Sequence, residues 1–341
     1  LERWKKMFKA KEGSCCVRLK TSMSDPDPAF RDRVMFRISD RKHPRTKGKY
    51  RVYPLLDFSW AIDDHLLGIT HIVRGKDLVM ETRVEKFIWD IFKWEYPEVV
   101  HTGFLSIEGI KLSKSKGSLE VKSGEFRGWN DPRTWSLQSL KDRGILPRAI
   151  EEFIIGQGVR KSDATIPVDV LYTINKRLIE DSPRYFFVPS PVKIKINGTP
   201  KLIAKIPLHP SGKKGVRSYK TEQTFYISKE DFDLMENRDY RLMHLLNFKA
   251  SRIMTAKPRE FSFLSADPDD KLDVKYIQWL PGESDVFNVE VVMPDGSLVN
   301  GYGEEKLGGL KEGVIVQFER FGFVRLNKIE KNKLIFFFAH N

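Results

Sequence analysis

The spacing of apolar and polar residues predicts an α/β region in the first third of the chain. Residues 16–20 and 34–38 have the pattern of half-buried strands. Residues 69–73 form a short apolar run typical of a buried strand, and residues 99–105 predict a further strand. Between these runs apolar residues recur three and four positions apart, at Val84, Phe87, Ile88, Ile91 and Phe92. That spacing indicates an amphipathic helix on a core, and the order strand, helix, strand is typical of α/β structure.

Three further helices are predicted between residues 121 and 180. The first covers residues 137–143 and ends at Gly144, the second opens at Pro147 and the third at Pro167. Short helices in close succession predict a small bundle.

Beyond residue 181 the pattern changes to short strands separated by turns. Asn197-Gly198 follows an alternating run and is a strong hairpin signal, and Asp295-Gly296 marks a second tight turn. Strands are expected at residues 192–196, 224–227, 286–293, 314–318 and 334–338. Many short strands at this spacing favour one or two antiparallel barrels.

The charge balance adds a polyanionic partner to this picture. Lysine and arginine number 59 against 46 aspartate and glutamate residues in 341, a formal charge of +13. An excess of that size fits nucleic acid. Basic residues gather in a loop at residues 41–49 and in a second loop with Lys213, Lys214, Arg217 and Lys220. We expect both loops to be solvated in the free protein and near phosphates in a complex.

Membrane-spanning and disulfide-rich classes do not fit. No apolar run approaches the ~18 residues that span a bilayer, and we find no secretory signal at the start. Cys15 and Cys16 are adjacent, so they form neither a metal-ligand spacing nor a disulfide framework. We therefore expect a reducing, cytoplasmic compartment and no structural metal.

The most distinctive chemistry lies in residues 109–117, a lysine- and serine-rich run bounded by glycines. Lys111 and Lys114 are compact charges on long stems, suited to mobile phosphates. Ser113 and Ser115 add hydroxyl donors. A flexible loop of this kind would stabilise charge on a departing pyrophosphate. On composition alone, the same run also fits a solvated surface segment.

Residues 111–115, Lys-Leu-Ser-Lys-Ser, resemble the lysine–serine signature of class I aminoacyl-tRNA synthetases. In that family the second lysine, here Lys114, contacts the phosphates of ATP during amino-acid activation. Residues 53–58, 64, 68–71 and 74–75 resemble the second nucleotide-fold half of glutamyl-tRNA synthetases of the archaeal and eukaryotic type. Residues 127–133 match a family segment written Gly-Trp-Asp-Asp-Pro-Arg, with Asn130 in place of the first aspartate.

The resemblance implies a glutamate site around Arg74. Related glutaminyl enzymes carry cysteine at the position of Arg74 and tyrosine at that of Leu56. Arginine is a charge-assisted partner for the substrate's side-chain carboxylate, and leaving it unpaired would penalise glutamine. Tyr53 lies in the same family segment and is assigned to the same site. Arg74 could instead form a surface ion pair with Asp77 or Asp64.

The β-rich part resembles the paired-barrel anticodon domain of glutaminyl-tRNA synthetase, whereas bacterial glutamyl enzymes use a helical one. The matching pieces are residues 183–185, 191–193, 209–210, 231–232, 240–242, 277–279 and 317–320. Splayed anticodon bases are read through their edges and by stacking. The resemblance assigns this role to Arg184, Gln317 and Arg320, and, across a gap in the local match, to Arg241. Each could also be an ordinary polar residue on a barrel surface.

The expected fold is multidomain, α/β followed by all-β. Residues 1–50 would end an acceptor-end-binding insertion, and residues 51–120 would form the second half of a Rossmann-type catalytic domain. Residues 121–180 would form a helical bundle along the tRNA, and residues 181–341 an anticodon-binding double β-barrel. The distal barrel is expected at about residues 265–318, with the C-terminal strands returning to the proximal barrel.

A second class I signature, His-x-Gly-His, is missing from this sequence. The resemblance therefore predicts that about 200 residues precede the chain. We expect the chain not to catalyse alone.

These features together predict part of a glutamate–tRNA ligase. The enzyme would use ATP with Mg²⁺ to form glutamyl-adenylate, then transfer glutamate to tRNA(Glu), with tRNA(Gln) left open as a second acceptor. We expect a monomer with no membrane partner. The second interpretation is a glutaminyl-tRNA synthetase, against which Arg74 and Leu56 argue. The third is a non-catalytic RNA-binding protein, against which the intact residues 111–115 argue.

Overall fold

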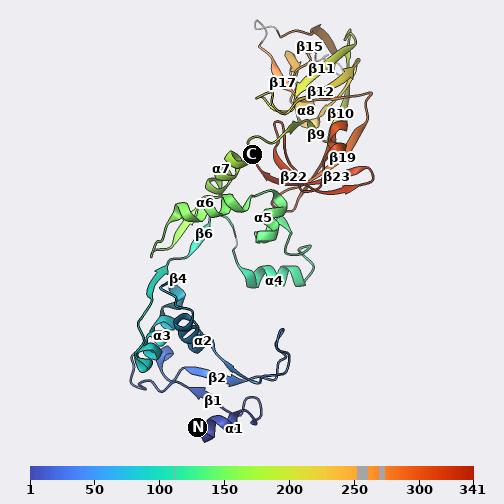
Figure 1. The fold of residues 1–341 in the computed structure, drawn as a ribbon. Coiled ribbons are helices and arrows are strands. Elements are labelled where there is room, and N and C mark those ends of the chain that lie inside the picture. The colour runs from blue at the N-terminus through green and yellow to red at the C-terminus, as the bar shows by residue number, and fades with distance from the viewer. Residues whose placement is uncertain (111, 252–259, 269–272) are drawn as a thin grey trace. The chain divides into compact units, whose positions relative to one another are not determined.

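The computed structural model of the chain describes residues 1–110, 112–251, 260–268 and 273–341 (Figure 1). The chain divides into two compact units. Unit 1 comprises Leu1–Ser106 with Gln157–Thr165, and unit 2 comprises Ile107–Gly156 with Ile166–Asn341. The predicted divisions at residues 50, 120 and 180 all fall inside these units.

Unit 1 combines a three-stranded antiparallel sheet with a strand–helix–strand element. Its helices and strands are α1 (Glu2–Met7), β1 (Cys16–Arg18), β2 (Val34–Ile38), β3 (Val52–Pro54), α2 (Leu56–Leu66), β4 (His71–Gly75), α3 (Val79–Phe92) and β5 (Glu98–Thr102). Strands β1, β2 and β3 pair in that order, whereas β4 and β5 pair in parallel. Parallel neighbours need a crossover, which α3 supplies. The predicted α/β order is therefore confirmed here.

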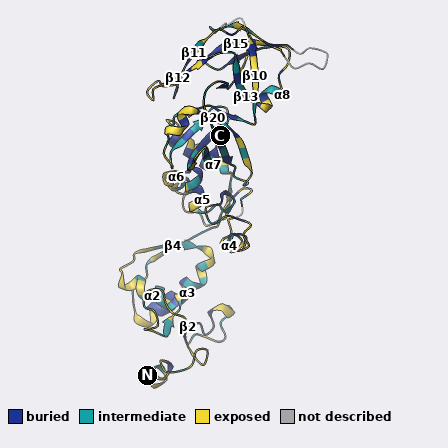
Figure 2. Cartoon of the chain, turned by 90° about the vertical axis from the view of Figure 1, so that its right-hand side faces the viewer, coloured by how far each residue is buried: buried dark blue, intermediate teal, exposed yellow. Residues whose placement is uncertain are grey.

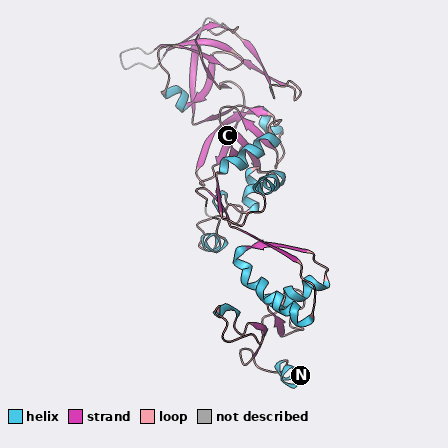
Figure 3. Cartoon of the chain, turned by 90° about the vertical axis from the view of Figure 1, so that its left-hand side faces the viewer, coloured by secondary structure: helices cyan, strands magenta, loops and turns pink. Residues whose placement is uncertain are grey.

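Helices α2 and α3 lie side by side and share one apolar core with the first 50 residues (Figure 3). Trp89 of α3 is buried and donates a hydrogen bond from Nε1 to the Ala61 carbonyl oxygen of α2 at 2.8 Å. Phe30 and Met35, from the segment before α2, pack into the same cluster. A segment of a few short strands buries too little apolar surface to fold alone, so residues 1–50 do not form a separate part.

The predicted helix at residues 84–92 is confirmed, and α3 begins earlier, at Val79. Lys93 ends it with φ 58°. The strand predicted at residues 69–73 is shifted to β4 and is not buried, because Val73 is 61 % exposed. Its sheet has only two strands, so β4 lacks the neighbours that bury strands in larger parallel sheets.

Unit 2 begins with helices. These are α4 (Lys114–Lys122), α5 (Leu137–Arg143), α6 (Pro147–Gln157) and α7 (Val168–Ile179). Strands β6 (Leu105–Ile107) and β7 (Ala164–Ile166) form a separate two-stranded sheet, and each strand has its first two residues in unit 1 and its last residue in unit 2. The three predicted helices are confirmed: Gly144 ends α5 with φ 89°, Pro147 opens α6 and Pro167 caps α7. Helix α4 corrects the prediction, because its first residues were expected to be a flexible loop.

A buried arginine attaches these helices to the last strand of the chain. Arg143 of α5 donates from Nη2 to the Ala339 carbonyl at 2.8 Å and to the Tyr172 hydroxyl at 2.8 Å. Asn175 of α7 donates from Nδ2 to the Gly144 carbonyl at 3.2 Å, and the same amide lies 2.9 Å from His340 Nε2. Buried polar groups need hydrogen-bond partners. These bonds therefore hold α5 and α7 against the last strand of the chain, which contains residues 339 and 340.

The remainder of unit 2 consists of short strands. They are β8 (Arg184–Tyr185), β9 (Phe187–Pro189), β10 (Pro191–Asn197), β11 (Leu202–Pro207), β12 (Val216–Thr221), β13 (Thr224–Ser228), β14 (Asp239–Leu242), β15 (Leu246–Ser251), β16 (Glu260–Ser265), β17 (Lys275–Ile277), β18 (Leu280–Pro281), β19 (Val286–Val292), β20 (Leu298–Glu304), β21 (Ile315–Phe318), β22 (Gly322–Glu330) and β23 (Lys333–His340), with the short helix α8 (Lys229–Asp233) after β13. Figure 2 shows that many of their residues are buried.

Most of these strands form two sheets, each with seven strands among the described residues and each nearly closed. One sheet has the order β8-β21-β22-β23-β19-β20-β9, and the other β17-β14-β15-β16-β10-β13-β18. In each sheet the two edge strands are consecutive in the chain, so the edges meet at one place and the sheet wraps around its core. We call the first sheet the terminal barrel and the second the inserted barrel.

Three details differ from the sequence prediction. The inserted barrel uses strands from residues 191–281 and the terminal barrel the strands at 184–189 and 286–340, so residues 265–318 do not form a barrel of their own. Among the described residues of the two barrels, four strand pairs are parallel: β10–β16, β14–β17, β19–β23 and β8–β21. Asn197-Gly198 reverses the chain, but β10 pairs with β13 and β16, whereas β11 pairs with β12. A turn signal sets a local reversal, and pairing depends on distant strands. The Asp295-Gly296 hairpin is confirmed, because β19 and β20 pair across it.

A buried ion pair joins the terminal barrel to the β11–β12 hairpin. Arg217 Nε of β12 lies 2.6 Å from Glu304 Oε2 of β20, and both side chains are almost fully buried. Glu304 also accepts hydrogen bonds from the Phe186 backbone N–H and the Tyr219 hydroxyl. Arg217 donates from Nη1 to the Pro207 carbonyl at 2.8 Å. The expectation of a solvated basic loop is therefore wrong for Arg217.

We predict that Arg217→Met destabilises the chain by about 3–5 kcal/mol, because Glu304 would be left buried without its cation. Urea unfolding measures the change. Arg238→Met is the control, since Arg238 pairs with the exposed Asp273 and should cost less than about 1 kcal/mol. Equal losses in the two variants would contradict this account of the pair.

We also predict that stability falls as pH drops below about 6.5, and that His340→Asn weakens this dependence. Burial lowers the pKa of His340, and the nearby Arg143 charge lowers it further. The unfolded chain therefore takes up a proton that the folded chain resists, and stability is lost on the acid side. Urea unfolding at about pH 7.5 and about pH 5.5 tests this. The exposed His71→Asn is the control, and an unchanged slope in His340→Asn would contradict the prediction.

Candidate functional site

The lysine–serine run forms the beginning of a helix. Ser113 caps α4, and its Oγ accepts a hydrogen bond from the Lys116 backbone N–H at 3.5 Å. Lys114 and Ser115 are the first two helical residues, and Lys111 lies outside the described residues. The first backbone N–H groups of a helix are unpaired and carry partial positive charge. Lys114 adds a full charge there, so this end of α4 can hold a phosphate.

Two hollows in unit 2 flank the beginning of α4. One of about 410 Å³ is lined by Leu112, Ser113, Lys114, Trp129, Thr134, Trp135, Ser136 and Gln138. The other, of about 530 Å³, includes Ser113, Lys116, Glu120, Arg133, Tyr172 and Asp295 in its lining. Ser113 contributes to both, so the predicted phosphate-binding residues border open space.

The Gly-Trp-Asn-Asp-Pro-Arg segment has a structural role that the sequence analysis did not identify. Asp131 is buried and accepts hydrogen bonds from the backbone N–H of Arg127 at 3.2 Å and from Arg133 Nε at 2.9 Å. Burial raises the pKa of Asp131, but these donors outweigh it and leave the pKa below its usual value. Arg133 in turn stacks on Phe126 at 4.2 Å. The segment therefore fixes the conformation of the chain that follows α4. The sequence signal for this role was an aspartate directly before a proline, a pair that favours the start of a helical turn.

Arg74 is buried in unit 1 and pairs with a residue that the sequence analysis missed. Both Nη atoms donate to the Glu85 carboxylate of α3, Nη1 at 2.9 Å, and the Arg74 side chain is 8 % exposed. The Trp60 ring lies 5.6 Å from the guanidinium. The alternative of a surface pair with Asp77 or Asp64 is wrong, because the partner is Glu85. The sequence signal for this ion pair was Glu85 itself, an acid on the apolar face of α3 three residues before Ile88.

The electrostatics around Arg74 are those of a buried acid–base cluster. Burial raises the pKa of Glu85, and the hydrogen bonds from Arg74 oppose that rise. Burial also raises the pKa of Asp64, again opposed by Arg74. The Nε atom of Arg74 is buried and has no partner among the described residues. A buried unpaired donor is uncommon and marks a position where a ligand can bind.

The other residues assigned to the glutamate site lie in the same unit. Tyr53 of β3 is half-buried and donates its hydroxyl to the Tyr50 carbonyl at 2.9 Å. Leu56 opens α2 and is 59 % exposed. Arg74 belongs to unit 1 and Lys114 to unit 2.

Two of the predicted anticodon residues are direct neighbours in the terminal barrel. Arg184 of β8 and Gln317 of β21 are register partners in a parallel pair. Arg184 Nε and Gln317 Oε1 are buried and have no partner among the described residues. Glu180 lies 3.5 Å from Arg184 Nη2. These two neighbouring residues therefore hold one unpaired donor and one unpaired acceptor, the kinds of group that bind base edges.

The other two predicted anticodon residues differ from each other. Arg320 follows β21 and forms a bidentate ion pair with Asp231 of α8, with both N–O distances at 2.8 Å. Arg241 lies in the inserted barrel, is 6 % exposed, and donates to Asn247 Oδ1 at 2.9 Å and to the Ala266 carbonyl at 3.3 Å. The structure therefore groups Arg184, Gln317 and Arg320 in and beside β21, and places Arg241 in a different sheet.

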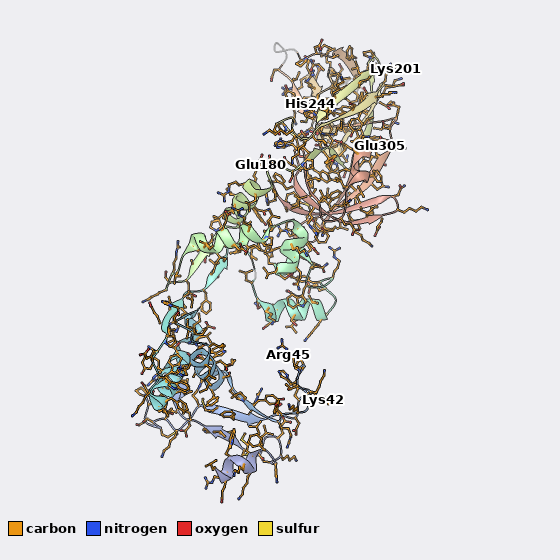
Figure 4. All side chains as sticks on the ribbon, in the orientation of Figure 1. Lys42, Arg45, Glu180, Lys201, His244 and Glu305 are labelled. Atoms are coloured by element: carbon orange, nitrogen blue, oxygen red, sulfur yellow. The ribbon has the colours of Figure 1, made fainter. Side chains whose placement is uncertain are left out.

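Exposed basic side chains cover the loop between β2 and β3 in unit 1. Figure 4 shows Lys42 and Arg45 on this loop. Its backbone is ordered by a bridge between His43 and Lys47, with hydrogen bonds of 2.9 Å in both directions. His43 Nδ1 also accepts from the Arg45 and Thr46 backbone N–H groups at 3.2 Å.

Two classes of site find no support in the described part of the chain. Its His, Cys, Asp and Glu side chains form no group of three or more that could hold a metal ion. None of its helices has the length and apolar character needed to cross a membrane.

Comparison of the sequence with known proteins places the chain in a family. The family model described as tRNA synthetases class I (E and Q), catalytic domain, matches residues 1–181. Two models described as the anti-codon binding domain of the same synthetases match residues 182–266 and 252–327.

Curated relatives match over the whole of this chain. A glutamate–tRNA ligase of Pyrococcus abyssi is 43 % identical over 350 residues, which cover 100 % of this chain and 61 % of the relative. A glutamate–tRNA ligase of Methanocaldococcus jannaschii is 39 % identical, with the same coverage of each chain. The chain thus spans about three fifths of the length of these relatives.

A solved structure of a glutamate tRNA ligase from Elizabethkingia meningosepticum is 19 % identical, with a TM-score of 0.30 over 44 % of this chain and 33 % of that one. A likeness this low carries no argument. The catalytic-domain match alone covers more than half of the sequence, and therefore the chain belongs to the class I tRNA synthetases of the E and Q group.

Proposed function

We propose that this chain belongs to a glutamate–tRNA ligase that activates glutamate with ATP and transfers it to tRNA(Glu). The observation that carries the proposal is the 43 % identity to a glutamate–tRNA ligase, which extends over the entire chain. Identity of that extent includes the segment around Arg74, the beginning of α4 and both barrels. Each of these supplies a different part of the reaction.

Arg74 is proposed to bind the side-chain carboxylate of glutamate. Its pair with Glu85 uses one N–H of each Nη atom and fixes the guanidinium plane. The Nε–H and the second N–H on each Nη remain as donors for a substrate carboxylate. A glutamine side chain would offer Arg74 a neutral amide oxygen in place of an anion, so the contact with the substrate would lose its charge assistance, while Glu85 would still pair the cation.

The beginning of α4 is proposed to bind the phosphates of ATP. Lys114, the capped helix end and Ser115 converge on one region, and Lys111 and Ser113 belong to the same run. Charge that develops on pyrophosphate during adenylate formation would be stabilised there. The described residues offer no acidic cluster for a metal, so Mg²⁺ is proposed to arrive bound to ATP.

The barrels are proposed to read the anticodon of tRNA(Glu). Arg184 and Gln317, which are register partners, carry an unpaired donor and an unpaired acceptor, and Arg320 follows the end of β21. Arg241 remains a weaker candidate, because its guanidinium already donates hydrogen bonds within the inserted barrel. From the resemblance to the archaeal and eukaryotic glutamyl enzymes, we also propose that the protein acts as a monomer.

We predict that the full-length protein catalyses ATP–pyrophosphate exchange with glutamate and not with glutamine. Arg74→Cys should raise the KM for glutamate about 100-fold, because a charge-assisted hydrogen-bonded pair is worth about 3 kcal/mol. The KM for ATP should stay unchanged. With tRNA(Glu) present in the assay, exchange driven by glutamine would favour a glutaminyl enzyme, and exchange with neither amino acid would favour a non-catalytic RNA-binding protein.

A matched pair of lysine variants tests the phosphate site. Lys114→Ala should lower the exchange rate about 100-fold, because an electrostatic donor to developing charge is lost. Lys122→Ala, at the other end of α4, should leave the rate within about twofold. Equal effects of the two substitutions would contradict the assignment of the phosphates to the beginning of α4.

A further inference from the structure

An ion pair crosses between the two barrels beside the proposed anticodon residues. Arg320 follows β21 of the terminal barrel, and Asp231 lies in α8, which follows strand β13 of the inserted barrel. Arg320 Nη1 donates to Asp231 Oδ2 and Nη2 to Oδ1, each at 2.8 Å. The Asp231 side chain is 8 % exposed and that of Arg320 is 37 % exposed. The carboxylate is therefore buried while the guanidinium still reaches solvent.

The Asp231 carboxylate is itself held in place. Ser228 caps α8: its Oγ accepts from the Asp231 backbone N–H at 3.0 Å, and its hydroxyl donates to Asp231 Oδ2 at 2.9 Å. Arg320 has φ 59°, a region that residues other than glycine rarely adopt. Fixed partners on both sides leave the guanidinium little freedom of orientation.

The pair leaves one edge of the guanidinium available. Among the described residues, the hydrogen bonds of Arg320 use one N–H of each Nη atom and do not use Nε–H. Nε–H and the adjacent second N–H on one Nη atom are parallel donors. They match two neighbouring acceptors, such as N3 and O2 of cytosine or N7 and O6 of guanine. Uracil and adenine place a donor beside an acceptor on the corresponding edges.

We propose that Asp231 is a positioning residue: it orients Arg320 so that the free donor edge reads an anticodon base with two adjacent acceptors. The inference rests on the proposed function, because it takes tRNA as the ligand. Asp231 acts through Arg320 and does not touch RNA. A phosphate also presents paired acceptors, and the test separates the two.

Electrostatics make the test sharp. Asp231 is an acid in a chain of net charge +13, so removing its charge raises the local positive potential. A purely electrostatic role predicts that Asp231→Asn binds every RNA more tightly. The positioning role predicts weaker binding of the cognate RNA and a loss of discrimination.

The experiment measures binding of this chain to the anticodon stem-loop of tRNA(Glu) and to stem-loops in which each anticodon cytosine or guanine is replaced by uracil or adenine. Asp231→Asn should lose about tenfold in affinity for the cognate loop and bind cognate and substituted loops alike. Asp231→Glu, which keeps the acid, should retain part of the discrimination. Asp233→Asn is the matched control, because it removes an equal charge from the exposed side of α8; it should leave the discrimination between cognate and substituted loops unchanged.

Arg320→Lys completes a double-mutant cycle. Lysine cannot form the two-donor edge, so Arg320→Lys should lose the same discrimination and Asp231→Asn should add little to it. Thermal unfolding midpoints confirm that each variant is folded before its binding is compared.

Asp231→Asn with undiminished discrimination would overturn the inference. So would an equal loss for every RNA together with a shallower salt dependence, since that is the behaviour of a phosphate contact. Failure of the unmodified chain to prefer tRNA(Glu) stem-loops would instead refute the proposed function, so the two failures are distinguishable.

Discussion

A buried carboxylate determines how the β-rich half of this chain is assembled. Glu304 is surrounded by Arg217, the Tyr219 hydroxyl and the Phe186 backbone N–H, which come from the β11–β12 hairpin and from the link between β8 and β9. A charge without these partners would cost several kcal/mol in the core. The hairpin and the closing edge of the terminal barrel therefore have to occupy fixed positions around it.

That constraint extends to the proposed reading surface. Arg217 also lies 3.8 Å from Glu319, which directly precedes Arg320 and is two residues from Gln317. The buried network thus adjoins the strand end that holds the candidate anticodon residues. The unpaired polar atoms of Arg184 and Gln317 lower the stability of the free protein. The rigid structure around them holds them in position for a ligand.

The sequence predicted the features that depend on neighbouring residues. Gly144, Pro147 and the Asp295-Gly296 turn act through local backbone geometry, so helix ends and one hairpin were correct. Strand pairing after Asn197-Gly198 was wrong, because it depends on β13 and β16, far along the chain. Local sequence patterns do not determine which strands pair when the strands are far apart in the chain.

The candidate sites follow the same division. The lysine–serine run and Arg74 were found from short motifs, but Glu85 as the partner of Arg74 was not, because their pairing requires α3 to pack against β4. Arg217 was grouped with nearby lysines, since composition cannot show that β20 brings Glu304 to it. Asp231 and Arg320 become partners only when two barrels meet.

The proposed function is the attachment of glutamate to tRNA in a reaction that depends on the anticodon. The most direct measurement is aminoacylation by the full-length protein, with radiolabelled amino acids and tRNA(Glu) transcripts that carry native or exchanged anticodons. We expect glutamate on the native transcript and a large loss of rate when the anticodon is exchanged. Attachment of glutamine, or attachment of glutamate regardless of the anticodon, would contradict the account.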